Sequence, residues 1–356
     1  MRILSLLGAL ALGLPATSAL ADDCGPLQQV NSIDILGGPN RPLVQVGLNG
    51  TPKLFLLDTG GDISQINGTV AQELKLPERE AGLKMLDLYG HASNKRVEIE
   101  KFTLGHQTGE DIDMMVQPNP KFGEGTPFVG IFAPDLMGRY DVEFDFANRK
   151  MNYFSTDHCP GHVVYWPHQA LAITPMTFRN CHIRLPVQLD GKEIQAEIDT
   201  GSGNTNLTAE AARQLFDIKP DTPGNLPLNM PGMAAAFGRV FTTLDFEGVA
   251  VKNPHIIIRP DLVGSKDPDN RASTESRARR VDQLDDQPDL LIGMDVLKRL
   301  RLYAAFKEDR LYISEATRPV AAKALPASSV TGTDAPADAV SAAPSHMSAG
   351  PAPGQP

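Results

Sequence analysis

The chain has 356 residues, of which 41% are hydrophobic and 21% charged, and this length suffices for two ordinary domains. Its formal net charge is −10 and no long run of basic residues occurs, which argues against an electrostatic grip on nucleic acid or anionic lipid. Three cysteines exclude a disulfide scaffold, and without a CxxC pair the usual motif for zinc binding or thiol redox chemistry is missing.

The first residues have the pattern of a secretory signal peptide. Arg2 precedes an apolar run, and the tripeptide Ala-Leu-Ala at 19–21 is the small-x-small pattern that a signal peptidase reads. We expect a signal peptide over residues 1–21; the alternative is a buried N-terminal helix. The run is shorter than the about 20 apolar residues that span a bilayer, and no later segment reaches that length. The sequence therefore predicts a periplasmic or secreted protein of bacterial type without a membrane span, in a compartment that permits disulfides.

An internal repeat organises the rest of the chain. Residues 44–61 return as residues 185–202, at an offset of 141 residues. At this offset Asn49-Gly50 corresponds to Asp190-Gly191, and both dipeptides favour type I′ turns between two strands. Each unit is therefore predicted to open with a β-hairpin whose second strand ends at Asp-Thr-Gly.

The repeat continues through a short helix to a second shared motif. The helices are predicted over residues 70–76 and 209–216. The motif is a hydrophobic segment that contains Asp135 in the first unit and Asp295 in the second, at an offset of 160 residues, so the second unit holds 19 more residues. Most of these fall in a charged segment at 265–288, which we expect to be a surface loop.

Two tandem copies rich in short strands predict an all-β protein with two lobes. We expect the N-terminal lobe at residues 22–157 and the C-terminal lobe at residues 158–318. Residues 319–356 are rich in Ala, Pro, Ser and Gly, which predicts a disordered tail. The alternative is a pair of independent duplicated domains that share no site.

Each copy places an aspartate, Asp58 or Asp199, where an apolar strand leaves the core. One Asp-Thr-Gly turn is weak evidence, because such turns are common. If the lobes pack about a pseudo-twofold axis, however, the two turns meet on it and the adjacent carboxylates share one proton. Such a pair can activate a water while it polarises a carbonyl, which is what peptide hydrolysis without a metal or a covalent nucleophile requires.

These motifs resemble those of the retropepsin-like aspartic proteases, with two such units fused into a pepsin-type bilobal chain. The resemblance covers residues 30–157 and 165–315. It implies two β-barrel lobes related by pseudo-twofold symmetry in one monomer, which acts as an endopeptidase on peptides or proteins and needs no cofactor or metal. It also implies a catalytic pair, Asp58 and Asp199. The supporting residues would be Thr59, Gly60, Thr200, Gly201 and Ser202.

Two positions depart from the family pattern. Ala133 stands where the second unit has Gly293, and Gly61 stands where it has Ser202. A protein that keeps the fold but only binds peptides, without catalysis, is therefore the competing hypothesis. Retention of both Asp-Thr-Gly turns favours the protease, because a binding module needs neither carboxylate.

The resemblance further implies a hairpin flap over the substrate. The candidates are residues 86–97, with Tyr89 near the tip, and residues 230–240. The ring of Tyr89 would cover the site while its hydroxyl reaches the substrate; the alternative is an exposed loop tyrosine.

The cysteines and the histidines between the units have competing interpretations. The resemblance brings the two ends of the first unit together, which favours a disulfide between Cys24 and Cys159; pairing of Cys159 with Cys181 is the alternative. His158, Cys159, His162 and His168 include a His-x3-His spacing that can hold zinc. Because prolines and a glycine interrupt this segment, we expect solvent-exposed linker histidines and no metal.

Overall fold

The structure is a computed structural model that describes residues 24–86, 92–117, 121–137, 139–228, 236–260 and 288–317. The predicted signal peptide, Tyr89, nearly all of the segment at 265–288 and the tail at 319–356 lie outside the described residues. The described residues belong to one compact unit. Within the described part of the chain, no helix is long and apolar enough to cross a membrane.

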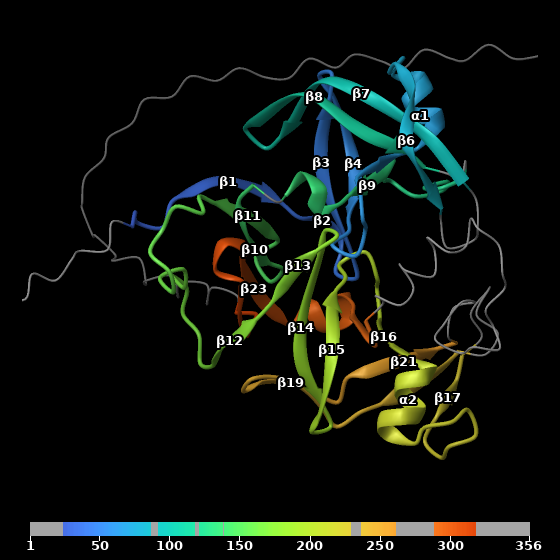
Figure 1. The fold of residues 1–356 in the computed structure, drawn as a ribbon, viewed down its shortest axis with the longest axis vertical. Coiled ribbons are helices and arrows are strands. Elements are labelled where there is room, and N and C mark those ends of the chain that lie inside the picture. Colours follow the sequence, from blue (N-terminus) through green and yellow to red (C-terminus); the bar gives the residue numbers. More distant parts are fainter. Residues whose placement is uncertain are drawn as a thin grey trace, which may run out of the picture. The chain divides into compact units, whose positions relative to one another are not determined.

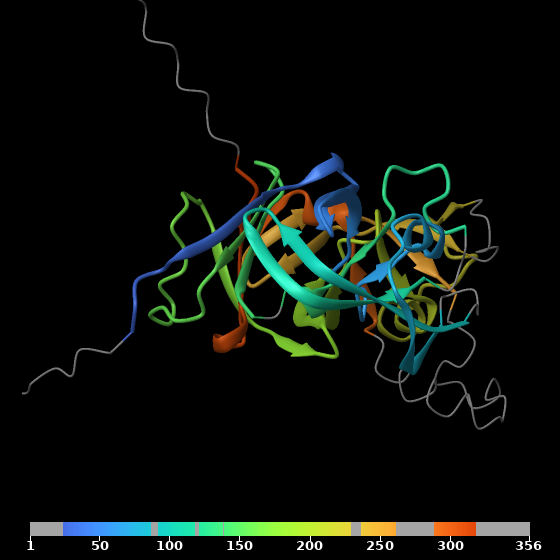
Figure 2. The ribbon, with the colours of Figure 1, turned by 90° about the horizontal axis from the view of Figure 1, so that it is seen from above.

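The described residues are mostly β-strands in three sheets, so the predicted all-β, bilobal architecture is confirmed (Figure 1). The first repeat forms an eight-stranded sheet with the order β2-β3-β4-β9-β5-β8-β7-β6, in which the long strands β7 and β8 run side by side (Figure 2). Its strands are β2 (Leu36–Gly38), β3 (Arg41–Leu48), β4 (Thr51–Leu57), β5 (Gln65–Ile66), β6 (Glu78–Leu86), β7 (Ala92–Leu104), β8 (Gln107–Val116) and β9 (Gly130–Phe132).

The second repeat forms a ten-stranded sheet with the order β17-β18-β21-β16-β22-β15-β14-β19-β20, and β13 pairs with β14. Its strands are β13 (Thr177–Arg179), β14 (His182–Leu189), β15 (Lys192–Ile198), β16 (Thr205–Thr208), β17 (Leu226–Pro227), β18 (Phe237–Val240), β19 (Thr243–Phe246), β20 (Val249–Lys252), β21 (His255–Arg259) and β22 (Leu290–Ile292).

The third sheet combines strands of both repeats, in the order β1-β11-β10-β23-β24-β12. Its members are β1 (Gln29–Asp34), β10 (Asp141–Asp145), β11 (Lys150–Phe154), β12 (Leu171–Pro175), β23 (Leu300–Ala305) and β24 (Arg310–Glu315). Strand β10 of the first repeat pairs directly with β23 of the second, which ties the two lobes together. Every residue of these two strands is buried, because the sheet is covered on both faces.

Local sequence explains the paired hairpins of the two lobes. Asn49 and Asp190 both have φ of 47°, and Gly50 and Gly191 follow with φ of 85° and 77°. Two successive residues with positive φ are what a type I′ turn requires, so the predicted hairpins are confirmed. In β14, alternating buried and partly buried residues match a strand with one face on the core.

Short helices follow the strands at equivalent points of the two repeats. They are α1 (Gly68–Glu73), α2 (Ala209–Phe216) and α4 (Met294–Leu297), with 3-10 turns η1 (Pro134–Leu136) and η3 (Phe306–Glu308). Asn67 and Thr208 cap α1 and α2 by accepting backbone N–H groups of the first turn. Helix α2 has the predicted bounds. Helix α1 begins two residues before the predicted segment at 70–76, directly after its Asn67 cap, and ends three residues before the end of that segment.

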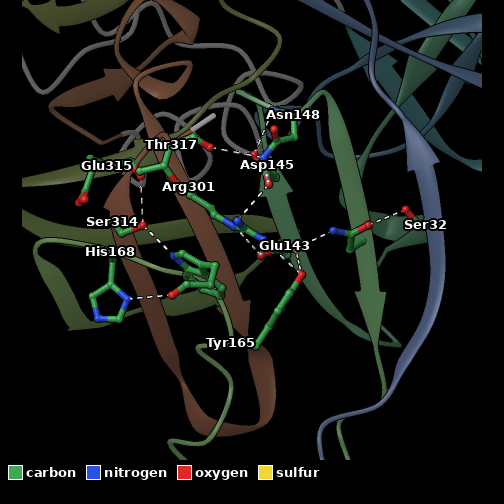
Figure 3. A network of polar contacts seen from close by, with 12 residues as sticks. Ser32, Glu143, Asp145, Asn148, Tyr165, His168, Arg301, Ser314, Glu315 and Thr317 are labelled. Atoms are coloured by element: carbon green, nitrogen blue, oxygen red, sulfur yellow. Dashed lines mark hydrogen bonds and ion pairs between the residues drawn. The ribbon is translucent and has the colours of Figure 1, made fainter. Parts of the chain in front are cut away.

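A buried polar network holds the strand pair that joins the lobes. Figure 3 shows Arg301 of β23 beside Glu143 and Asp145 of β10, with nitrogen to oxygen distances of 2.7 and 3.1 Å. The hydroxyl of Tyr165 donates to Glu143 at 2.6 Å, and the guanidinium of Arg301 lies over the ring of Trp166. Loss of one member of such a buried pair would leave an uncompensated charge, so this sheet depends on both lobes.

The segment between the lobes folds back over the six-stranded sheet. Its residues Val163 and Trp166 pack with Tyr303 and Tyr312 in a small core. The expectation of solvent-exposed histidines is therefore wrong for His158, whose side chain is 2% exposed and lies 2.7 Å from Asp141. This burial arises from tertiary packing and leaves no periodic signal in the sequence.

The favoured disulfide between Cys24 and Cys159 is confirmed, with a Cα to Cα distance of 4.8 Å, and Cys181 is a free thiol. Cys24 lies five residues before β1 and Cys159 lies five residues after β11. These two strands are neighbours in the sheet, which brings the two cysteines together. It closes a loop across a sequence separation of 135 residues, which encloses the first lobe.

Replacing Cys24 and Cys159 together by alanine should lower the free energy of unfolding by about 2–5 kcal/mol, because the unfolded chain regains the freedom that the long loop closure removes. Urea denaturation measures this. Cys181→Ser is the matched control and should unfold like the wild type. A reductant should destabilise the wild type and leave the double variant unchanged; equal sensitivity of both would contradict the assignment.

Candidate active site

The two Asp-Thr-Gly turns leave equivalent strands in the same way. Leu57 at the end of β4 pairs in parallel with Phe132 of β9, and the backbone N–H of Asp58 donates to the Phe132 carbonyl at 3.0 Å. In the second lobe Ile198 of β15 pairs with Ile292 of β22, which accepts the Asp199 N–H at 3.0 Å. Each aspartate is thus fixed at the point where a buried parallel strand pair ends.

The threonines of the two turns hold the lobes to each other. The hydroxyl of Thr59 donates to the Ile198 carbonyl at 2.7 Å and accepts the Thr200 N–H at 3.0 Å. Reciprocally, the hydroxyl of Thr200 donates to the Leu57 carbonyl at 2.8 Å and accepts the Thr59 N–H at 3.0 Å. Both threonines are fully buried, so all four hydrogen bonds form out of contact with water.

The turns bring the carboxyl groups of Asp58 and Asp199 together, close enough for each to act on the pKa of the other. The glycines make this approach possible, because each faces the carboxylate of the opposite lobe. A Cβ atom on Gly60 would lie 2.6 Å from the carboxyl carbon of Asp199, and one on Gly201 would overlap the carboxylate of Asp58. Any larger residue at either glycine would push the two acids apart.

Burial and mutual repulsion keep a proton on this pair. Burial is the largest cause and the neighbouring Asp199 carboxylate the second, and together they raise the pKa of Asp58 to about 8. Burial also raises the pKa of Asp199, but its Oδ1 accepts two backbone N–H groups, from Gly201 at 3.0 Å and Ser202 at 3.1 Å. The Asp58 carboxylate accepts the Gly60 N–H at 3.0 Å, while the N–H of Gly61 points to the Asp58 carbonyl.

The two loops differ in the number of backbone donors to the carboxylate. Hydrogen bonds from backbone N–H groups stabilise a carboxylate in its charged form. Asp199 has two such donors and Asp58 has one, which favours charge on Asp199 and the proton on Asp58.

A further pair of polar contacts in each lobe joins the segment after the turn to the second shared motif of the repeat. The aspartates belong to that motif, whereas Ser64 and Thr205 were not expected from the sequence. In the first lobe the Ser64 hydroxyl donates to Asp135 at 2.6 Å and accepts the Ala133 N–H at 3.0 Å. In the second lobe Thr205 donates to Asp295 at 2.7 Å and accepts the Gly293 N–H at 3.1 Å. The offsets of the repeat relate Ser64 to Thr205 and Asp135 to Asp295, so the repeat could have revealed them.

The two departures from the family pattern face each other. A Cβ atom on Gly61 would lie 3.4 Å from the Cβ of Ala133 and 3.5 Å from the Asp58 carboxyl carbon. In the second lobe Ser202 has the side chain and the other position is Gly293, where a Cβ would lie 2.3 Å from the Asn204 carbonyl oxygen and 2.9 Å from that of Ser202. The backbone of the second turn therefore leaves no room for a side chain at Gly293.

Comparison with known proteins gives a match to one family model. Residues 44–132 match the family model described as aspartyl protease. The resemblance to the aspartic proteases is confirmed. A search of curated protein sequences found no match.

Two solved structures are similar to the chain. An aspartic proteinase from Irpex lacteus shares 12% identity, covering 82% of this chain and 98% of its own, with a TM-score of 0.48. Basic 7S globulin from soybean shares 10% identity, covering 82% of this chain and 96% of its own, with a TM-score of 0.44.

Both flap candidates lie at hairpins of this aspartic-protease-like chain. Strands β6 and β7 pair up to Leu86 and Ala92, and the candidate Tyr89 lies outside the described residues between them. Strands β17 and β18 pair on either side of the second candidate, whose tip is likewise outside the described part. Among the described residues, no group of three or more His, Cys, Asp or Glu side chains is arranged to hold a metal ion.

Thr59→Val and Thr200→Val should each lower the free energy of unfolding by about 2–4 kcal/mol, since each leaves a buried N–H and a buried carbonyl without a partner. Urea denaturation of the single variants measures this. Thr59→Ser and Thr200→Ser keep the hydroxyl and should retain most of the stability. If serine were as costly as valine, the loss would come from packing of the methyl group.

Proposed function

We propose that this protein is an aspartic endopeptidase whose catalytic pair is Asp58 and Asp199, with Thr59, Gly60, Thr200, Gly201 and Ser202 as supporting residues. One observation carries the proposal: two carboxyl groups from equivalent loops lie together, each against the glycine of the opposite turn, and each acts on the pKa of the other. Buried acids are costly for stability, and a fold that served only for binding would gain nothing from two of them in contact. The match to the aspartyl protease family model supports the same reaction class.

The protonation pattern gives each acid a role. The Asp199 carboxylate takes a proton from a water molecule as the water oxygen attacks the peptide carbonyl carbon. Asp58 donates its proton to the carbonyl oxygen, so a neutral tetrahedral diol forms. As the C–N bond breaks, Asp199 returns the proton to the leaving amine and Asp58 recovers one from the diol. No metal or covalent intermediate is required.

We further propose that the enzyme acts outside the cytoplasm as a monomer, after removal of residues 1–21. The disulfide between Cys24 and Cys159 supports an oxidising compartment. The intramolecular threonine contacts support a monomer, because they complete within one chain the pairing that a dimer of single units would need.

Asp58→Asn and Asp199→Asn should each reduce cleavage of an unfolded protein substrate at least about 1000-fold, because each removes a proton donor or acceptor of the pair. Fragment formation by the full-length protein at several pH values is the measurement. The control Asp245→Asn changes an aspartate of β19 and should leave activity intact.

An inhibitor that mimics the tetrahedral diol should block the wild type. Cleavage that survives in both asparagine variants would contradict the shared pair. A folded wild type that binds peptides and cleaves none would instead support the competing binding-protein hypothesis.

The dependence of kcat/KM on pH should be bell-shaped, with an alkaline limb near pH 8. Asp58 must be protonated to act as an acid, so activity falls as pH rises through its pKa of about 8. Asp199 must be charged to act as a base, so activity also falls at low pH, below a limb that lies above 3.8 because burial raises its pKa. Steady-state kinetics between pH 3 and pH 10, in steps of about half a unit, would show both limbs. Activity confined to strongly acidic pH would contradict this assignment.

A further inference from the structure

We propose that His182 is a positioning residue of this site, a cation that links the turn carrying Asp58 to the strand carrying Asp199 and sets the charge balance of the pair. The proposal rests on the peptidase function proposed above and goes beyond it, since His182 belongs to neither Asp-Thr-Gly turn.

The imidazole of His182 bridges the two lobes. At the start of β14, its Nε2 lies 2.7 Å from the carboxylate of Asp62, four residues after Asp58 in the first lobe's turn. Its Nδ1 lies 2.9 Å from the carboxylate of Glu197, two residues before Asp199. Glu197 is buried and is also bound by Arg184 at 2.9 Å. Negative and positive side chains thus alternate from the first lobe's turn, at Asp62, through His182 to Glu197 on the strand that leads into the second turn.

The charges around the ring favour its charged form. The contact of Nε2 with Asp62 is a hydrogen bond, whereas Nδ1 lies 2.9 Å from the Glu197 carboxylate as an ion pair without hydrogen-bond geometry. An imidazolium is attracted to both carboxylates, and a neutral ring loses this attraction. The two carboxylates raise the pKa of His182 to about 9 against the opposing effect of burial. The cation therefore persists throughout the pH range proposed for activity.

The charged groups around His182 come from several elements. Asp62 faces it from the first lobe's turn, Glu197 and then Arg184 from β15 and β14, and Asp58 is close enough for its pKa to be lowered by the imidazolium. The neighbouring Cys181 thiol lies near Asp62 and Asp135, which with burial raise its pKa. Glu197 in turn raises the pKa of Asp199. The cluster therefore acts on both acids.

The bridge exists on one side of the pseudo-twofold axis. At the offset of 141 residues, His182 corresponds to Arg41 and Asp62 corresponds to Gly203, which has no carboxylate. Glu197 corresponds to Leu56, so the buried anion is also missing from the first lobe. A structural clamp common to the fold would be expected in both copies. The one-sided placement indicates a role in setting the balance of charge between the two acids, because the cation lowers the pKa of Asp58 while Glu197 raises that of Asp199.

His182→Gln keeps a donor of similar reach and removes the charge. Loss of the cation should raise the pKa of Asp58, so the alkaline limb of kcat/KM should move about one pH unit upward. Loss of the bridge should also lower kcat/KM at pH 6 about 10-fold or more, through misplacement of the turn. His182→Arg keeps a charge that can reach both carboxylates and should restore the wild-type limb and most of the activity.

His106→Gln is the matched control, because His106 is exposed in the turn after β7, and it should leave the profile unchanged. The proposal would be overturned by a His182→Gln profile with the wild-type limb. An arginine variant no better than the glutamine variant would overturn it as well.

A second measurement does not depend on catalysis. In the wild-type full chain, NMR titration of the histidine rings should show His182, assigned by its loss in His182→Gln, with a pKa near 9. Asp62→Asn, at an exposed side chain that should not affect folding, should move this pKa down towards 6.5. Titration of His182 at 6.5 in the wild type would overturn the proposal. The outcome is readable even if the protein cleaves nothing, in which case the peptidase function alone fails.

Discussion

Four hydrogen bonds made by the hydroxyl and N–H groups of Thr59 and Thr200 are the constraint on which the site depends. Two carboxyl groups in contact repel each other and lose hydration, so the loops that carry them separate unless something stronger holds them. The threonine contacts provide this because each joins one loop to the strand end behind the other. Gly60 and Gly201 then leave room for the opposite carboxylate. The two acids are thereby held in contact by hydrogen bonds between the threonine hydroxyls and the backbone of the opposite lobe.

The six-stranded sheet also fixes the position of one lobe relative to the other. Strand β10 of the first repeat and β23 of the second are buried along their whole length, yet contain Glu143 and Arg301. An ion pair buried at this seam is costly to form, and it is tolerated because both partners are satisfied by further contacts. A different alignment of β10 and β23 would leave Glu143 or Arg301 buried without its partner. The ion pair thus favours a single arrangement of the lobes, which the contact between Asp58 and Asp199 requires.

The repeat made most of this architecture predictable. The hairpins at Asn49 and Asp190 and the paired Asp-Thr-Gly turns follow from local rules that apply twice along the chain. The contacts of Ser64 and Thr205 were within reach of the same comparison. The predicted solvent exposure of His158 was wrong because its burial depends on the linker that folds over the six-stranded sheet. The bridge from His182 to Asp62 was not predictable, since it joins residues of different lobes and has no second copy to compare.

Duplication gives two equal acids, whereas hydrolysis needs an acid and a base. The structure shows two local sources of inequality: the extra backbone donor from Ser202 to Asp199, and the cluster of His182, Asp62 and Glu197 on one side of the axis. These act in opposite directions, because the imidazolium favours charge on Asp58 while the second donor favours charge on Asp199. The backbone donors contact Asp199 directly, whereas the imidazolium contacts neither acid, so the proposed mechanism places the charge on Asp199. The opposing cation reduces the difference between the two acids, which eases the exchange of proton between them during a reaction cycle.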